Sequence, residues 1–196
     1  MKVRFIMTIL AAVFSVGTSI GQGPGLIEPG RVYQWQGLTV MSPDEPGWTL
    51  ATSDGTRIVF ERRNDQEILQ ASVSFIKTKV YETDADLFAG LEPLKEEEWK
   101  ALKVDHLHFN SMGAKGGGGP FLQYDAIFNL DDTVAPGFRY LNLRGRLYPH
   151  PYNKGQVVQV EFSVRSSVRG FLEDQLSLVE EFLAKAVVPK SAAKPV

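Results

Sequence analysis

The sequence predicts an α+β fold, in which an antiparallel β-sheet is packed by two main helices. From residue 105 to residue 164, apolar and polar side chains alternate with a period of two, which is typical of strands that bury one face. Two other segments, near 83–102 and 168–187, repeat apolar residues every three to four positions, as amphipathic helices do. Short links between the four later strands favour an antiparallel meander, so both helices are expected to cover its one apolar face.

The start of the chain differs in kind from the rest. Lys2 and Arg4 precede an apolar run at 6–16 that is too short to span a bilayer. Small residues at Ser19 and Gly21 fit a signal-peptidase site, so we expect cleavage directly after the second of them. An uncleaved anchor and a buried N-terminal helix are the alternatives.

The chain is therefore expected to have four parts. They are a signal peptide over 1–21, a flexible leader rich in Gly and Pro over 22–31, a single α+β domain over 32–188 and a disordered tail over 189–196. A chain of 196 residues is long enough for one domain with a substantial core. No second apolar run reaches membrane length, so a cleaved chain is expected to be periplasmic or secreted.

Composition excludes several classes of function. Removing the signal peptide leaves 19 basic against 23 acidic residues, a net charge of −4, which argues against a nucleic-acid binder. The sequence contains no cysteine, which removes thiol nucleophiles, disulfide exchange and cysteine zinc sites.

Before the first helix, the pattern predicts five short strands. The expected strands are 32–36, 38–41, 48–51, 57–62 and 68–79. Turn residues separate them, above all Ser42–Gly47 and the Asn64–Asp65 pair. In the last of the five, Leu69 to Phe75 alternates cleanly with Gln and Ser, so one face of this strand is expected to be buried.

The first helix is expected to begin after Thr83, its predicted N-cap, and to kink at Pro93. Its apolar stripe comprises Leu87, Phe88, Leu91, Leu94, Trp99 and Leu102. The second helix is expected over about 168–187, capped by Ser167 and ended by Pro189. Its stripe comprises Leu172, Leu176, Val179, Phe182 and Leu183.

A short motif near the N-terminal end of the domain resembles the superfamily of PsbP and Mog1, which includes exported bacterial PsbP-like proteins. The motif is Gly37-Leu38-Thr39-Val40, then Pro43, then Gly47-Trp48, followed by the charged strand at 60–63 and a closing helix. Two extra residues between Pro43 and the Gly-Trp pair, and the KGGGGP segment, depart from the usual form. The resemblance implies an antiparallel sheet sandwiched by helices and action through binding or assembly, and it supplies no catalytic residues.

Two histidines suggest a metal site. On a strand, His106 and His108 face the same way, and two imidazoles can share a zinc or copper ion. His150 or Asp125 would have to supply a third ligand. The alternative is a pair of solvated histidines on a polar sheet face.

No catalytic motif is found. The Gly-rich segment 113–120 lacks the Gly-Lys-Ser/Thr leading into a helix that a phosphate loop needs, and we expect a flexible hairpin loop there. Ser111 lacks the first glycine of a nucleophile elbow, and Asp131-Asp132 lacks the further ligands of a calcium loop.

The alternation also predicts a shared polar surface on the sheet face opposite the core. Its expected members are His106, His108, Asp125, Tyr140, Arg144, Arg146 and Glu161. Arg144 and Arg146 would bind a carboxylate or phosphate bidentately. The alternative is a solvated face with cross-strand ion pairs.

These observations favour a non-catalytic, exported accessory domain that binds a protein partner in the cell envelope, with the polar face and the Gly-rich loop as contacts. The alternative is a protein that binds a small ligand or a divalent metal ion on the same face. No nucleic-acid partner and no other cofactor are expected.

Overall fold

The structure is a computed structural model that describes residues 25–100, 104–112, 120–130 and 137–188. Its strands are β1 (Val32–Trp35), β2 (Leu38–Met41), β3 (Thr49–Ser53), β4 (Arg57–Arg63), β5 (Glu67–Lys77), β6 (Val104–Met112), β7 (Phe121–Asn129), β8 (Tyr140–Pro149), β9 (Gln156–Ser166) and β10 (Val187–Val188). Its helices are α2 (Asp84–Lys100) and α3 (Glu173–Lys185).

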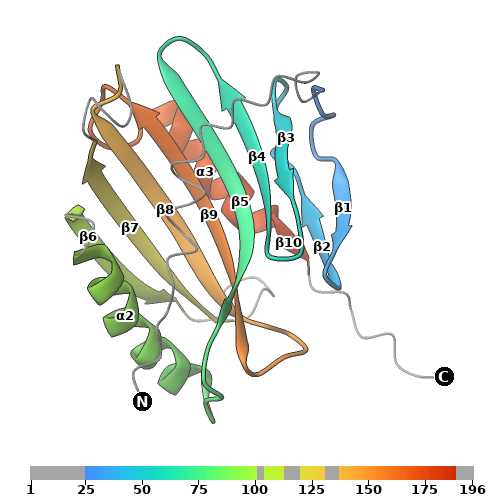
Figure 1. Cartoon of the computed structure of the whole chain (residues 1–196), viewed down its shortest axis with the longest axis vertical. Coiled ribbons are helices and arrows are strands. Elements are labelled where there is room, and N and C mark those ends of the chain that lie inside the picture. The colour runs from blue at the N-terminus through green and yellow to red at the C-terminus, as the bar shows by residue number, and fades with distance from the viewer. Residues whose placement is uncertain (1–24, 101–103, 113–119, 131–136, 189–196) are drawn as a thin grey trace.

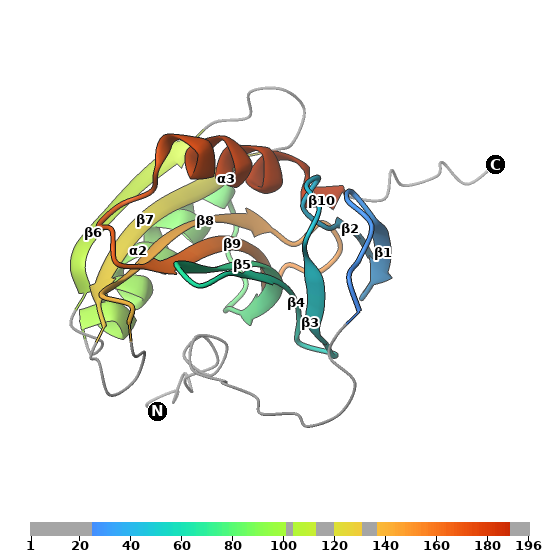
Figure 2. The same ribbon diagram turned by 90° about the horizontal axis from the view of Figure 1, so that it is seen from above.

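A large antiparallel sheet forms the centre of the fold (Figure 1). Its strands lie in the order β3-β4-β5-β9-β8-β7-β6, and a small antiparallel sheet, β1-β2-β10, lies beside it. Helix α3 lies over one face of the large sheet and α2 over the other, as Figure 2 shows from above. The α+β class, the two helices and the antiparallel meander from β6 to β9 are therefore confirmed.

The apolar side of the sheet changes face between β9 and β8. On β9, Phe162 and Val160 point toward α3, but their cross-strand partners on β8 are Arg144 and Arg146. The reverse holds on the other face, where Leu147 of β8 lies opposite Gln159 of β9. Away from this boundary, apolar residues lie opposite apolar residues, such as Ala71 opposite Phe162 and Ala126 opposite Leu143.

The expectation of one apolar face covered by both helices is therefore wrong. Each strand keeps its period of two, but the phase shifts by one position between the two halves of the sheet. As a result, two apolar clusters lie on opposite faces. The α3-side cluster includes Trp48, Phe60, Val160, Phe162 and Phe182, and the α2-side cluster includes Trp99, Tyr124, Leu141, Leu143 and Leu147.

Helix α2 begins as its sequence predicts. The Thr83 hydroxyl accepts a hydrogen bond from the Asp86 N–H and donates one to the Asp86 carboxylate. The helix runs without a break through Pro93. Leu94, expected in the buried stripe, is 42% exposed, and Lys95 is buried in its place. Leu102 lies outside the described residues.

Helix α3 begins five residues later than expected. Gly170 adopts a positive φ of 87°, and the chain turns there before the first helical residue, Glu173. Ser167 therefore does not cap the helix, and Leu172, expected in the stripe, is exposed. The Gln175 side chain accepts a hydrogen bond from the Leu172 N–H instead, which satisfies one free donor at the helix start.

The Gly-Trp pair places a fully buried tryptophan in the α3-side cluster. Gly47 has a φ of 91°, which favours glycine, and Trp48 directly after it is fully buried with its ring edge against Phe162. Part of the expected leader is held against the same region, because the Ile27 N–H donates to the Trp48 carbonyl. Within the described residues, no helix is long and apolar enough to cross a membrane.

Candidate functional site

The α3 side of β8 carries the polar residues that the sequence singled out. Arg144 lies opposite Asp125 of β7, and Arg146 lies opposite Gln123. Tyr140 shares this face at the first position of the strand. Because β8 borders the α3-side cluster, these side chains stand at the edge of an apolar layer, directly beneath the helix.

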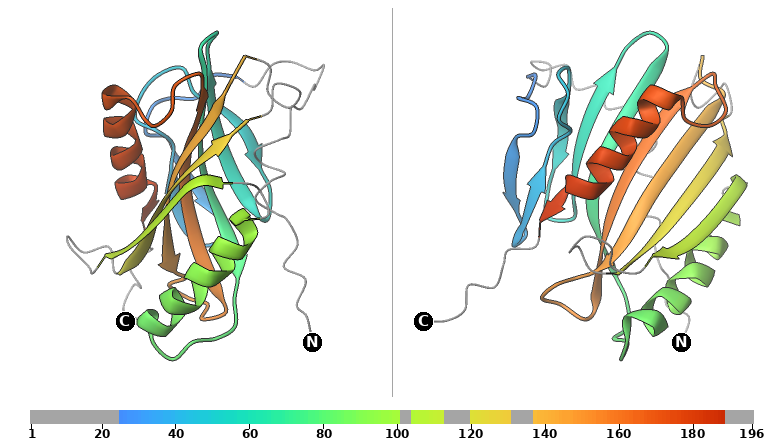
Figure 3. Two further views of the ribbon diagram at one scale, coloured as in Figure 1. Left: turned by 90° about the vertical axis from the view of Figure 1, so that its left-hand side faces the viewer. Right: turned by 180° about the vertical axis from the view of Figure 1, so that it is seen from behind.

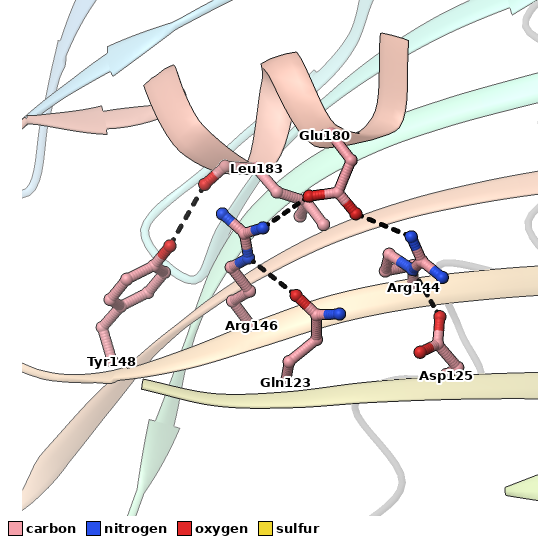
Figure 4. A network of polar contacts seen from close by, with 7 residues as sticks. All are labelled: Gln123, Asp125, Arg144, Arg146, Tyr148, Glu180 and Leu183. Carbon is pink, nitrogen blue, oxygen red and sulfur yellow. Dashed lines mark hydrogen bonds and ion pairs between the residues drawn. The ribbon is translucent and has the colours of Figure 1, made fainter. Parts of the chain in front are cut away.

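One glutamate of α3 joins the two arginines (Figure 4). Arg144 donates from Nη1 to one carboxylate oxygen of Glu180, and Arg146 donates from Nη2 to the other, both at 2.6 Å. Each arginine also uses Nε, toward Asp125 at 2.5 Å and toward Gln123 at 3.1 Å. We call these five residues the arginine network.

The charges of the two arginines are balanced by carboxylates within the arginine network itself. Burial of Arg144 disfavours its charged form, but the bonds to Asp125 and Glu180 outweigh burial and raise its pKa. Two positive guanidinium groups face two carboxylates, so the carboxylate that Arg144 and Arg146 bind is that of Glu180. In this structure they hold α3 on the sheet rather than offer two free cations to an external anion.

A hydroxyl extends the same attachment. Tyr148 of β8 donates from its hydroxyl to the Leu183 carbonyl near the end of α3, at 3.1 Å. Burial raises the pKa of Tyr148, so the hydroxyl keeps its proton and remains a donor. Helix α3 is thus bonded to β8 at two places along its length.

Beyond α3, the same face of β6 and β7 is uncovered by either helix (Figure 3, right). Its side chains, polar except for Ile127, form a surface that we call the open face. His106, His108 and Asn110 of β6 are exposed there, and Gln123, Asp125 and Ile127 of β7 are half-buried. The open face is therefore continuous with the arginine network through Gln123 and Asp125.

The loop between β9 and α3 borders the open face. Arg169 donates two hydrogen bonds to Asp105 of β6, at 2.7 and 3.1 Å. Asn142, fully buried on β8, holds the loop by donating to the Val168 carbonyl and accepting from the Gly170 N–H. The apolar side chains of Val168 and Leu172 remain exposed on this loop.

The structure brings His106 and His108 together on one face, as expected. His108 lies opposite Asp125, whose carboxylate already accepts from Arg144. His150 lies elsewhere, with its ring 5.1 Å from that of Phe75 on β5. Within the described ranges, no three histidine, aspartate or glutamate residues are grouped so that they would hold a metal ion.

Glu161 does not belong to the predicted surface. It lies opposite Gly145 and points to the α2 side of the sheet, because β9 and β8 differ in phase. There its carboxylate accepts a hydrogen bond from the Tyr124 hydroxyl at 2.5 Å. The other six predicted members lie on the α3 side.

The contact of Glu161 with Tyr124 is part of a second, buried network that the sequence did not predict. Tyr124, Gly145 and Glu161 are in register on three neighbouring strands, and the Tyr124 ring reaches across the glycine. A Cβ on Gly145 would lie 2.3 Å from the Tyr124 Cζ, so only glycine leaves room.

Two further side chains complete this network. Gln159 donates from its amide to the Tyr124 oxygen at 2.9 Å, and Lys95 of α2 donates to the Gln159 oxygen at 3.4 Å. We call Lys95, Tyr124, Gln159 and Glu161 the tyrosine network. Nearly all of it is buried, which suits a structural link between α2 and β9 better than contact with a substrate.

The one sequence signal for the tyrosine network is Gly145 itself, an isolated glycine in the middle of a strand pattern, which marks a close approach. Comparison with known proteins adds no assignment: no family model matches the chain, and no curated protein matches its sequence.

Proposed function

We propose that this chain is an exported, non-catalytic accessory domain that binds a protein partner in the cell envelope through the open face. The observation that carries the proposal is the open face itself. It presents exposed polar side chains on a rigid sheet, next to a helix that the arginine network holds in place. Preorganised surfaces of this kind reduce the entropy lost on binding.

The border of the open face supports a protein partner over a small molecule. Val168 and Leu172 expose 42% and 45% of their surface in the loop beside it, although the rest of the loop is bonded to the sheet. Apolar side chains next to a polar surface are typical of protein interfaces. The segment 113–119, proposed as a further contact, lies outside the described residues.

Export and family membership are parts of the same proposal. The basic, apolar and small-residue order of 1–21 supports a periplasmic or secreted location. The placement of the sheet between helices on opposite faces, and the buried Trp48 after Gly47, support the PsbP/Mog1-like sandwich. That superfamily acts largely through binding and assembly, which agrees with the proposed role.

Site-specific photo-crosslinking tests this function. A photoreactive residue at Asn110, on the open face, is expected to give a product with an envelope protein in cells that naturally make this chain, distinct in mass from any product between two copies. The same residue at Lys77, exposed at the end of β5, is the matched control and should give none. N-terminal sequencing of the recovered protein should begin at Gln22.

Equal crosslinking at the two positions, or none at Asn110 in intact cells, would contradict the proposed contact. A product of twice the chain's own mass would report contact between two copies. Hydrolysis of test substrates by the purified protein would contradict the non-catalytic role.

A second candidate function is binding of a divalent metal ion by His106 and His108. The observation in its favour is that both imidazoles are exposed on one face. Protein purified without a histidine tag would then contain stoichiometric zinc or copper. A His106→Ala/His108→Ala variant would lose the metal, and metal below one tenth per chain in the wild type would exclude this function.

A further inference from the structure

We propose that β6 pairs with β6 of a second copy of this chain, so that two large sheets join edge to edge. This proposal does not rest on the proposed function. β6 ends the strand order, and one of its edges pairs with β7. Its other edge pairs with no strand in the described part of the chain, which leaves backbone N–H and C=O groups for another strand.

The two edges of the large sheet differ in how they are protected. β3 has five residues with a register shift between Leu50 and Thr52, and Thr49 also forms a bridge with Leu26. β6 has nine residues, and its own register shift lies at its start, between Val104 and His106, so the strand pairs regularly from His106 to Met112. It contains neither Lys nor Pro, the residues that commonly block an exposed edge.

The sequence of β6 selects a second β6 as the occupant. The strand reads Val-Asp-His-Leu-His-Phe-Asn-Ser-Met, and the order of apolar and polar residues is symmetric about its centre, His108. Antiparallel pairing about a two-fold axis at His108 places Leu107 opposite Phe109 and His106 opposite Asn110.

Other registers do not match. Moving the axis to Leu107 places Asp105 opposite Phe109, and moving it to Phe109 places Leu107 opposite Ser111. Each alternative opposes a polar residue to an apolar one on the same face, which disfavours the pair. The sequence therefore specifies one register for the pair of β6 strands.

The apolar pair would extend an existing cluster. Leu107 and Phe109 are only half-buried, and they pack against the α2-side cluster, where the Phe109 ring stacks on Trp99. In the paired sheets, Leu107 of one copy covers Phe109 of the other. His106, His108 and Asn110 stay on the opposite side, so the open faces of both copies remain free.

Disulfide crosslinking tests the register directly. The chain has no cysteine, so His108→Cys introduces a single thiol per copy on an exposed position. Residues opposed across an antiparallel pair have Cα atoms about 4.5–5.5 Å apart, which a disulfide spans. His106→Cys is the matched control, because the two thiols would lie about 13 Å apart along the strands.

Under mild oxidation of the full chain, His108→Cys is expected to crosslink at least ten-fold faster than His106→Cys. Equal rates, or faster crosslinking of His106→Cys, would overturn the proposed register. Circular dichroism of both variants confirms that they are folded.

Sedimentation provides a second test without crosslinking. The wild-type chain should show a concentration-dependent dimer that His108→Lys abolishes, because two ammonium groups would then meet at the axis. Ser53→Lys, the same charge change on the other edge strand, should leave the dimer intact. A wild-type monomer throughout the micromolar range, or a dimer that His108→Lys does not weaken, would overturn the proposal.

Discussion

The two halves of the large sheet bury their apolar side chains on opposite faces, one against α3 and the other against α2. On the α3 side, β4, β5 and β9 bury apolar side chains, and β8 presents arginines. On the α2 side, β6, β7 and β8 are apolar and β9 presents Gln159 and Glu161. The boundary between β8 and β9 is therefore polar on both faces.

Each helix meets this boundary with one charged side chain. Glu180 of α3 joins Arg144 and Arg146 at 2.6 Å, and Lys95 of α2 reaches Gln159 at 3.4 Å. The two networks differ in charge and burial: the arginine network is ionic and partly exposed, whereas the tyrosine network is more deeply buried. A sheet can thus change its apolar face between neighbouring strands when each helix supplies a partner for the polar strand beneath it.

The largest effect is expected at the buried network. Gly145→Ala should lower the free energy of unfolding by about 3 kcal/mol, because the added methyl group displaces the fully buried Tyr124 ring and its hydrogen bonds. Urea unfolding measures this loss. Gly155→Ala is the control, since its Cβ would find its nearest contact at 3.5 Å.

A double mutant tests whether the loss of stability in Gly145→Ala comes from the clash with the Tyr124 ring. Adding Tyr124→Leu to Gly145→Ala removes the clash, so the double variant should lose at least 1 kcal/mol less than the sum of the single variants. Additive losses, or a Gly145→Ala variant within about 0.5 kcal/mol of the wild type, would show that the ring does not depend on the glycine.

How much the sequence predicts depends on whether a feature is local to one strand. The period of two predicts every strand of the meander, and burial of Leu141, Leu143, Val158 and Val160 confirms that these side chains face the core. The phase between β8 and β9 is not local. Each strand alternates between apolar and polar residues, but the alternation does not say which residues of β8 and β9 lie opposite each other. Assuming one apolar face places Glu161 on the same face as Arg144. The hydrogen-bond register instead pairs Glu161 with Gly145, which places Glu161 on the other face.

The apolar stripes of the helices are likewise predicted only as far as they depend on local sequence. Lys95 is charged and Leu94 apolar, so periodicity selects the leucine, yet the structure buries the lysine. The reason is tertiary: the α2 side of β9 offers the Gln159 oxygen as a partner, and the Lys95 ammonium lies over the rings of Trp99 and Tyr124, 5.4 and 5.7 Å from their centres. The Thr83 cap depends on contacts within four residues and was correctly predicted.

A smaller effect is expected at the arginine network. Glu180→Gln should lower the free energy of unfolding by about 1–2 kcal/mol, because the amide accepts from one guanidinium and turns its NH2 group toward the other. Partial exposure of these side chains keeps the loss below that of a fully buried pair. Thermal unfolding at fixed pH measures it.

Glu181→Gln is the matched control one residue later on α3, where the partner is the exposed Lys185. Its stability should not be distinguishable from that of the wild type, because solvent screens an exposed pair. If both variants lose the same free energy of unfolding, the arginine network stabilises the fold no more than a surface ion pair does. Of the two networks at the boundary between β8 and β9, only the tyrosine network would then be important for stability.

The smallest effect concerns pH at the border of the α3-side cluster. Burial lowers the pKa of His150, whose ring packs on Phe75. The unfolded chain therefore takes up a proton more readily than the folded one as the pH falls through about 6.5, and stability decreases from there to the folded pKa and is flat below it. Urea unfolding at pH 7.5 and pH 5.0 should show a smaller decrease for His150→Phe, which keeps the ring contact, than for the wild type. An identical decrease in stability in both proteins would show that His150 does not contribute to the acid sensitivity. His150 would then not be buried by the α3-side cluster.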